Sequence, residues 1–250
     1  MYRSLVAHVY SSSLADRRTL IAHLLSSFGC AYERQSFVLD GYVGENILVN
    51  SLATAKGPNI IVSAHYDGWG AYDNAGGTVA LVWLTRFLAE SNLGRRKTPP
   101  GVFVVFLDGE ESGLLGARHF AASHRIDHED RIIGHVSLDG FGAGTHIGGF
   151  GNVRKIALED NAGRTIDFVL QADTTVFQEC GTSSLHLFSL PHAELRDLQR
   201  SARFPETWRL IHTPSDTPDR LKETYLPYVA LHLFERISTL NFNIRGIFSL

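Results

Sequence analysis

Apolar runs of strand length alternate along this chain with longer stretches of helical periodicity. The strand-like runs are NILVNSL from Asn46, NIIVSA from Asn59, GVFVVFL from Gly101 and IIGHVSL from Ile132. Helical patterns lie between them and begin at Gly76 and Gly113. Short runs rich in Val, Ile and Phe are typical of buried strands, and their alternation with helices favours parallel pairing. We therefore predict the α/β class, with a mixed, mostly parallel central sheet covered by helices on both faces.

Helices are also predicted near both ends of the chain. Apolar residues recur at helical spacing over residues 14–28, and Gly29 follows as a stop signal. A closing helix is predicted from Lys222 onward. The segment 142–189 is Gly-rich at first and has no convincing period. Because the 250 residues contain no internal repeat or linker, we expect one domain over residues 1–250.

The charge balance argues against nucleic acid and membrane surfaces as partners. The chain has 23 Lys and Arg residues against 26 Asp and Glu residues, a formal net charge of −3. Phosphate backbones and anionic lipids would require a basic surface instead. The chain has no signal-peptide core and no run of about 18 apolar residues, so we expect a soluble, cytoplasmic protein. Cys30 and Cys180 form no CxxC pair, which disfavours a thiolate zinc site and a disulfide framework.

Histidine and carboxylate side chains follow three of the predicted strands directly. His65 and Asp67 come after NIIVSA, Glu110 and Glu111 after GVFVVFL, and Asp139 after IIGHVSL. In an open α/β sheet, residues beyond the carboxyl ends of the strands converge on one crevice. We therefore expect these five side chains to lie close together.

Two further residues complete a plausible ligand set. Asp73 lies in the turn before the helix that opens at Gly76, and His212 lies in the segment IHTPSD. Two imidazoles with several carboxylates suit a pair of borderline-hard divalent ions. Each motif alone is more often a solvated or hydrogen-bonded surface feature than a ligand set. Their common placement at strand ends favours the metal site.

Four segments together resemble the successive motifs of the M28 zinc aminopeptidases. They are AHYDGWGAYDNAGG, FLDGEESGLLGARHF, VSLDGFG and IHTPSDTPDRL. The resemblance covers roughly residues 45–240 and is weaker over 142–205. It implies the zinc exopeptidase-like version of the α/β fold and a zinc-dependent aminopeptidase that acts on peptides with a free N-terminus.

The resemblance also implies two zinc ions and a role for each ligand. His65 and Asp139 would hold one ion, Glu111 and His212 the other, and Asp73 would bridge the two. A bridging carboxylate offsets the repulsion between two close cations. Two metals at such a site hold a water between them and lower its pKa.

Two carboxylates next to the ligands have implied roles in catalysis. Glu110 would be the general base, which takes the proton of the attacking water and passes it to the leaving amine. Asp67 would orient a ligand imidazole from behind. Glu110 and Glu111 are neighbours, so both can face one site only if the chain bends, and Gly109 makes such a bend inexpensive.

Several positions differ from the family pattern. Tyr72 replaces an acidic residue that often precedes the bridging aspartate, and we expect it to border the mouth of the site with Trp69. The usual Ser-Asp-His segment has no clear copy, and the nearest stretch, residues 181–188, lacks the aspartate. We expect His186 to lie outside the site, since a lone histidine is not a site. Asp216 is expected to brace the His212 loop.

Two other functions remain open. The segment FPETWRLIHT from Phe204 is similar to the glutaminyl cyclases, which share the fold but use a single zinc ion. The turn Asp73-Asn-Ala-Gly-Gly77 is closer to the aminopeptidase version and favours the peptidase. The second alternative is a non-catalytic binding module. Retention of every ligand argues against a module, because unpaired charges in a crevice cost stability.

Overall fold

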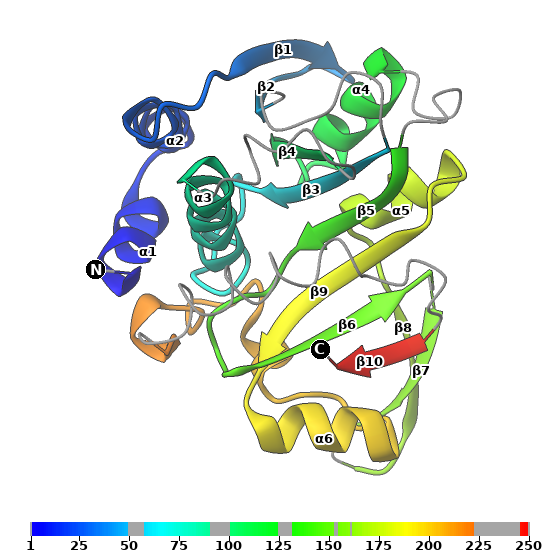
Figure 1. Cartoon of the computed structure of the whole chain (residues 1–250). Helices are drawn as coiled ribbons and strands as arrows, with labels where there is room; N and C mark the ends of the chain where they lie inside the picture. Colours follow the sequence, from blue (N-terminus) through cyan, green and yellow to red (C-terminus); the bar gives the residue numbers. More distant parts are fainter. Residues whose placement is uncertain are drawn as a thin grey trace.

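A mixed sheet of eight strands forms the centre of the protein (Figure 1). The computed structural model describes residues 2–49, 58–90, 101–124, 132–152, 155–160, 162–222 and 246–249. The strand order is β1-β2-β4-β3-β5-β9-β6-β10. The strands are β1 (Glu33–Leu39), β2 (Tyr42–Val49), β3 (Asn59–His65), β4 (Gly101–Leu107), β5 (Ile132–Leu138), β6 (His146–Gly151), β9 (Ser184–Leu190) and β10 (Gly246–Ser249). This arrangement agrees with the predicted α/β class.

The four central strands are parallel and the outer strands are antiparallel. β4, β3, β5 and β9 pair in parallel, whereas β1, β2, β6 and β10 add in antiparallel fashion at the two sides. The carboxyl ends of β3, β4 and β5 therefore lie at one edge of the sheet, as the sequence predicts. A separate two-stranded sheet joins β7 (Lys155–Glu159) to β8 (Thr165–Val169).

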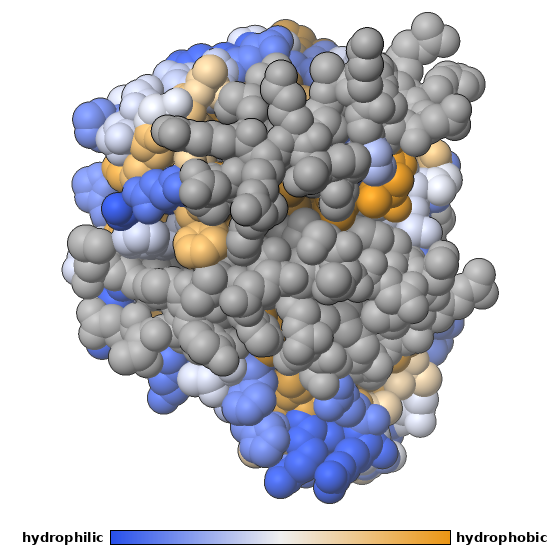
Figure 2. Space-filling model, in the orientation of Figure 1, coloured by the Kyte–Doolittle hydropathy of each residue, from blue (hydrophilic) through white to orange (hydrophobic). Residues whose placement is uncertain are grey.

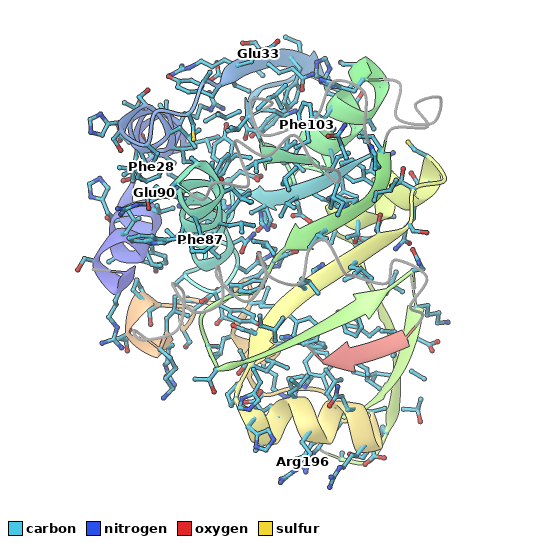
Figure 3. All side chains as sticks on the ribbon, in the orientation of Figure 1. Phe28, Glu33, Phe87, Glu90, Phe103 and Arg196 are labelled. Carbon is cyan, nitrogen blue, oxygen red and sulfur yellow. The ribbon has the colours of Figure 1, made fainter. Side chains whose placement is uncertain are left out.

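Helices cover both faces of the sheet. They are α1 (Tyr2–Ser11), α2 (Leu14–Ser27), α3 (Ala75–Glu90), α4 (Leu115–His124), α5 (Asp173–Glu179) and α6 (His192–Ser201), with the 3-10 turns η2 (Thr207–Leu210) and η3 (Pro218–Arg220). α1 and α2 pack on α3, while α4 and α5 pack on each other at the opposite face (Figure 1). Phe28, directly after α2, and Phe87 of α3 lie in the layer formed by α1, α2 and α3 (Figure 3). α6 packs on β6 and β10.

Strand periodicity divides the core into two layers. In β3, Ile60 and Val62 face the layer of α3, whereas Ile61 faces the layer of α4 and α5. On that second side, Phe103 packs its ring edge-on against Phe120 of α4, with the ring centroids 5.7 Å apart (Figure 3). Every residue of β3 is buried, because both faces are covered. This explains why the strand runs are continuously apolar rather than alternating.

The segment 142–189 contains more regular structure than the sequence indicates. It forms β6, β7, β8, α5 and most of β9. The closing helix predicted from Lys222 falls on residues 223–245, which lie outside the described part of the chain. Among the described helices, none combines the length and the apolar character needed to cross a membrane. The outward face of α6 is strongly hydrophilic (Figure 2), and Arg196 points outward from it (Figure 3).

Candidate metal centre

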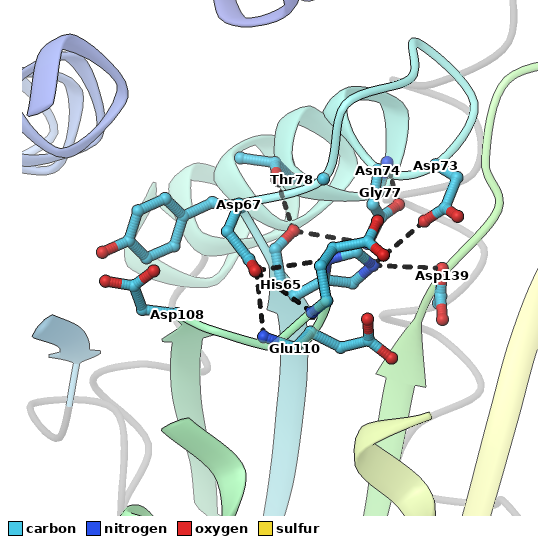
Figure 4. Close-up of polar contacts among 12 residues, drawn as sticks. His65, Asp67, Asp73, Asn74, Gly77, Thr78, Asp108, Glu110 and Asp139 are labelled. Carbon is cyan, nitrogen blue, oxygen red and sulfur yellow. Dashed lines mark hydrogen bonds and ion pairs between the residues drawn. The ribbon is translucent and has the colours of Figure 1, made fainter. Parts of the chain in front are cut away.

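His65 is the last residue of β3 and lies among three carboxylates (Figure 4). Its Nε2 atom is 3.2 Å from Asp73 Oδ1 and 3.4 Å from Asp139 Oδ1. Its Nδ1 atom is 3.4 Å from Asp67 Oδ1 on the other side of the ring. The side chain is 1% exposed, and neither ring nitrogen makes a well-aligned hydrogen bond. The imidazole is therefore held between two carboxylates at one nitrogen and a third at the other.

Asp73 lies between two groups of potential ligands. Its Oδ1 atom faces His65, whereas its Oδ2 atom is 3.3 Å from Nε2 of His212. The same His212 atom is 3.0 Å from Glu111 Oε2. His65, Asp73 and Asp139 thus form one compact set of donor atoms, and Asp73, Glu111 and His212 form a second. The two sets share a single residue, Asp73.

Close backbone packing places Asp73 at the start of α3. Asn74 Nδ2 donates to the Leu138 carbonyl at the end of β5, at 3.0 Å, and Asn74 Oδ1 accepts from the Gly77 amide. The peptide bond between Asp73 and Asn74 is cis. A Cβ atom on Gly77 would lie 2.4 Å from the Leu138 carbonyl oxygen. Glycine is therefore required for the first turn of α3 to lie against the end of β5.

Asp67 organises the loop that follows β4. Its two carboxylate oxygens accept the backbone N–H groups of Glu110 and Glu111, each at 3.2 Å (Figure 4). Gly109 has φ +70°, so the chain turns there as expected. The turn allows both glutamates to approach His65, since atoms of all three residues form a third compact set. One carboxylate thus fixes the positions of two neighbouring acids and one imidazole.

Asp216 connects the His212 segment to the Asp73 turn. Its carboxylate accepts the backbone N–H groups of Tyr72 at 2.7 Å and Asp73 at 3.1 Å, and the side chain is buried, with 2% exposure. It therefore braces the Asp73 turn as well as its own loop. His212 has φ +58°, a strained conformation for a non-glycine residue. Strain of this kind persists where surrounding contacts hold it, and it is concentrated at functional sites.

The crowded carboxylates shift the pKa values of both histidines upward. Burial alone would lower the pKa of His65, but Glu110, Asp139, Asp67 and Asp73 outweigh it and raise that pKa well above the usual range. A hydrogen bond to Asp73 raises the pKa of His212 to about 9. His212 therefore holds a proton at neutral pH when no metal ion is bound.

The acids of the site shift in opposite directions. Burial alone would raise the pKa of Asp73, but hydrogen bonds with His212 and His65 outweigh it and lower that pKa below its usual range. Burial raises the pKa of Glu110 to about 10, with His65 opposing that shift and Asp173, Asp139 and Asp73 adding to it. Burial also raises the pKa of Asp173 to about 7. Asp173 is 1% exposed and neither of its carboxylate oxygens has a hydrogen-bond partner.

Asp173 is a residue that sequence reasoning missed. It opens α5, and its pKa responds to His65, Asp139 and Asp67, so it belongs to the surroundings of the same site. The only signal in the sequence is an aspartate at the start of DTTVFQE, the stretch between the strand segments TIDFV and SLHLFSL. That signal is weak, because an isolated aspartate before a helix is usually an N-terminal capping residue.

Two other expectations about neighbouring residues were wrong. His186 Nδ1 lies 3.8 Å from Asp139 Oδ2, so His186 is beside the site rather than outside it. Burial lowers the pKa of His186. Tyr72 is 2% exposed and lies in the core instead of at the mouth, whereas Trp69 is 80% exposed.

The donor set fits zinc ions. Imidazole nitrogens and carboxylate oxygens are the ligands that zinc accepts besides thiolates. The Nε2 atom of buried His65 faces Asp73 and Asp139 without a well-aligned hydrogen bond and can serve as a metal ligand, and divalent cations would offset the negative charge of the surrounding carboxylates. All seven residues singled out in the sequence lie in this one place: His65, Asp67, Asp73, Glu110, Glu111, Asp139 and His212.

Solved structures share this fold over most of the chain. A glutaminyl cyclase from Porphyromonas gingivalis has a TM-score of 0.65 at 17% sequence identity, covering 95% of this chain and 96% of its own. The LapA aminopeptidase of Legionella pneumophila has a TM-score of 0.59 at 14% identity, covering 96% and 71%. BSAP, a zinc aminopeptidase from Bacillus subtilis, has a TM-score of 0.54 at 17% identity, covering 83% and 53%. Identities this low establish the fold alone.

Curated relatives match part of the chain more closely. A vacuolar membrane protease of Verticillium alfalfae is 35% identical over 89 residues, which are 34% of this chain and 8% of that protein. The vacuolar membrane protease of Kluyveromyces lactis is 33% identical over 110 residues, which are 42% of this chain and 11% of that protein. The matched segments therefore span only about a tenth of the length of these relatives.

The family assignment rests on a longer match. The model of peptidase family M28 matches residues 46–234, well over half of the 250-residue chain. The matched range contains every proposed ligand, from His65 to His212. Together with the fold and the gathered histidines and carboxylates, this match shows that the chain belongs to peptidase family M28.

Proposed function

We propose that this chain is a zinc-dependent aminopeptidase that binds two metal ions and removes N-terminal residues from peptides. The observation that carries the proposal is the position of Asp73, whose two oxygens face two different histidines, at 3.2 and 3.3 Å. A carboxylate shared in this way suits a pair of cations, because each oxygen can serve one ion while the negative charge offsets their repulsion.

The ligands divide into two sets around Asp73. His65 and Asp139 would hold one zinc ion, and Glu111 and His212 would hold the other. When bound, the zinc ions would supply Lewis-acid polarisation of the scissile carbonyl and an activated water. Asp67 would keep the His65 ring oriented through Nδ1, as carboxylates behind metal-binding histidines commonly do.

Glu110 would carry the proton during hydrolysis. Its carboxyl group lies in the same compact set as His65 and Glu111 but outside the two sets that share Asp73. In the proposed reaction, a Glu110 carboxylate oxygen accepts a proton from the attacking water and then delivers it to the leaving amine. The position beside the two ligand sets suits this role, because cations bound there would lower the pKa of Glu110 and leave its carboxylate ionised.

Metal analysis together with two activity assays tests the proposal. Purified protein reconstituted with zinc should hold two ions per chain and release nitroaniline from aminoacyl-nitroanilides, and chelation should abolish that release. Glu110→Gln should remain zinc-loaded and inactive, while Glu33→Gln, at an exposed position of β1, should match the wild type. One zinc ion with cyclisation of N-terminal glutamine would instead identify a cyclase. Failure to bind zinc would identify a non-catalytic module.

A further inference from the structure

Arg17 of α2 is a buried cation that binds backbone carbonyls of the loop after β3. Its Nη1 atom donates to the carbonyls of Tyr66 at 2.9 Å and Gly68 at 2.5 Å. Its Nε and Nη2 atoms donate to the carbonyls of Ser12 at 3.2 Å and Tyr10 at 3.3 Å, so the guanidinium is also held from its own side. The residue is 7% exposed. Arg17 thus links the helical layer at the N-terminal end to the loop that leaves His65.

The two carbonyls bound by Arg17 flank Asp67. Asp67 in turn faces His65 Nδ1 and accepts the backbone N–H groups of Glu110 and Glu111. A shift of the Asp67 backbone would therefore move an imidazole and two glutamates at once. The loop has little room to shift elsewhere, since a Cβ atom on Gly68 would lie 2.5 Å from the Asn74 amide nitrogen.

Charge gives Arg17 a second effect on the same residue. Burial lowers the pKa of Arg17 and the nearby Asp67 carboxylate raises it, so the two groups interact electrostatically. A guanidinium remains protonated in proteins, so a fixed positive charge lies near the Asp67 carboxylate and attracts it.

We propose that Arg17 is a positioning residue for the metal centre, acting through Asp67 to fix the Glu110–Glu111 loop and the His65 ring. The residue lies outside the range 46–234 that matches the family model, so the family assignment does not imply this role. The proposal rests on the proposed function, because it assumes that the centre binds zinc.

The experiment compares Arg17→Met with Arg3→Met. Arg3 of α1 also donates to two backbone carbonyls, those of Asp219 at 2.8 Å and Leu221 at 3.1 Å, but these carbonyls do not flank a proposed ligand or Asp67. Zinc affinity is measured by competition with a chromophoric chelator, and melting temperature is measured with and without zinc. Loss of carboxylates behind metal ligands typically weakens metal binding by 10–100-fold. Arg17 is one contact further from the metal ligands than such a carboxylate. For Arg17→Met we therefore expect zinc affinity to fall by about tenfold, and zinc to raise the melting temperature less than in the wild type.

Arg3→Met should lower the melting temperature without changing zinc affinity. If Arg17→Met behaves the same way, Arg17 is merely structural and the proposal is overturned. Should Arg17→Met fail to fold, Arg17→Lys keeps the charge but cannot make all four contacts, and it should weaken zinc binding to a lesser degree.

A double-mutant cycle tests whether the effect passes through Asp67. In an Asp67→Ala background, the Arg17→Met change should add little to the loss of zinc affinity, because coupled residues are not additive. Full additivity would contradict the proposed route. If the wild-type protein binds no zinc, the proposed function fails. If the wild type binds zinc and Arg17→Met binds it equally well, only the role of Arg17 fails.

Discussion

Replacing Asp216 with asparagine should weaken the contact between the His212 segment and the Asp73 turn. The carboxylate accepts two backbone N–H groups, from Tyr72 and Asp73, in a position that is 2% exposed. Asparagine retains one acceptor oxygen but turns an NH₂ group toward the other backbone donor. One charge-assisted bond is then lost and one buried N–H is left without a partner. A loss of this kind costs about 2–3 kcal/mol in free energy of unfolding.

Thermal and denaturant unfolding of the metal-free proteins would measure the change. For a chain of this length, a loss of about 2–3 kcal/mol corresponds to a drop of roughly 4–12 °C in melting temperature. Asp219→Asn is the matched control, since Asp219 lies in the same segment but is exposed, and its melting temperature should fall far less. If Asp216→Asn is as stable as this control, the two backbone hydrogen bonds do not contribute as the structure indicates.

Three predictions concern the metal centre. Glu110→Gln should keep its full zinc content while turnover falls by about 100-fold or more; near-normal turnover would contradict the assignment of the base. His212→Ala and Asp139→Asn should instead lower zinc affinity in a chelator competition, and unchanged affinity would remove them from the ligand set. His212 must lose the proton that its pKa of about 9 retains before it can bind metal. Zinc affinity should therefore rise with pH between about 6 and 9, with proton release in calorimetry; a pH-independent affinity would refute this.

The parallel core and most of the site could be predicted because they depend on short-range patterns. Each central strand is buried on both faces, so its apolar run is continuous and easy to recognise. The polar residues directly after β3, β4 and β5 then meet because parallel strands end at one edge. The positions of the strands were enough to predict that His65, Glu111 and Asp139 lie close together.

The prediction was weaker where buried strands carry polar residues. β9 has the sequence SLHLFSL and is fully buried, yet two serines and a histidine interrupt its apolar run. β6 has the sequence HIGGFG, and its glycines reduce the β propensity of the segment. Neither strand has the continuous or alternating pattern on which the prediction relied. The position of His186 beside Asp139 was missed because β9 itself was missed.

The other contacts that the sequence did not predict join distant parts of the chain. Arg17 is about 50 residues from the carbonyls that it binds, and Asp216 is 143 residues from Asp73. No local periodicity encodes such pairs, and a buried arginine in an amphipathic helix looks like any other charged helix residue.

These long-range contacts help the fold to hold several acidic side chains close together. Several carboxylates and two histidines share one crevice, where unpaired charge is costly. The protein offsets part of this cost without metal by keeping protons on Glu110 and His212 and by placing the Arg17 cation near Asp67. Divalent ions would offset the rest while displacing those protons. The ligands must then be held in place by neutral backbone contacts rather than by their mutual charges, and Asp67 and Asp216 make such contacts.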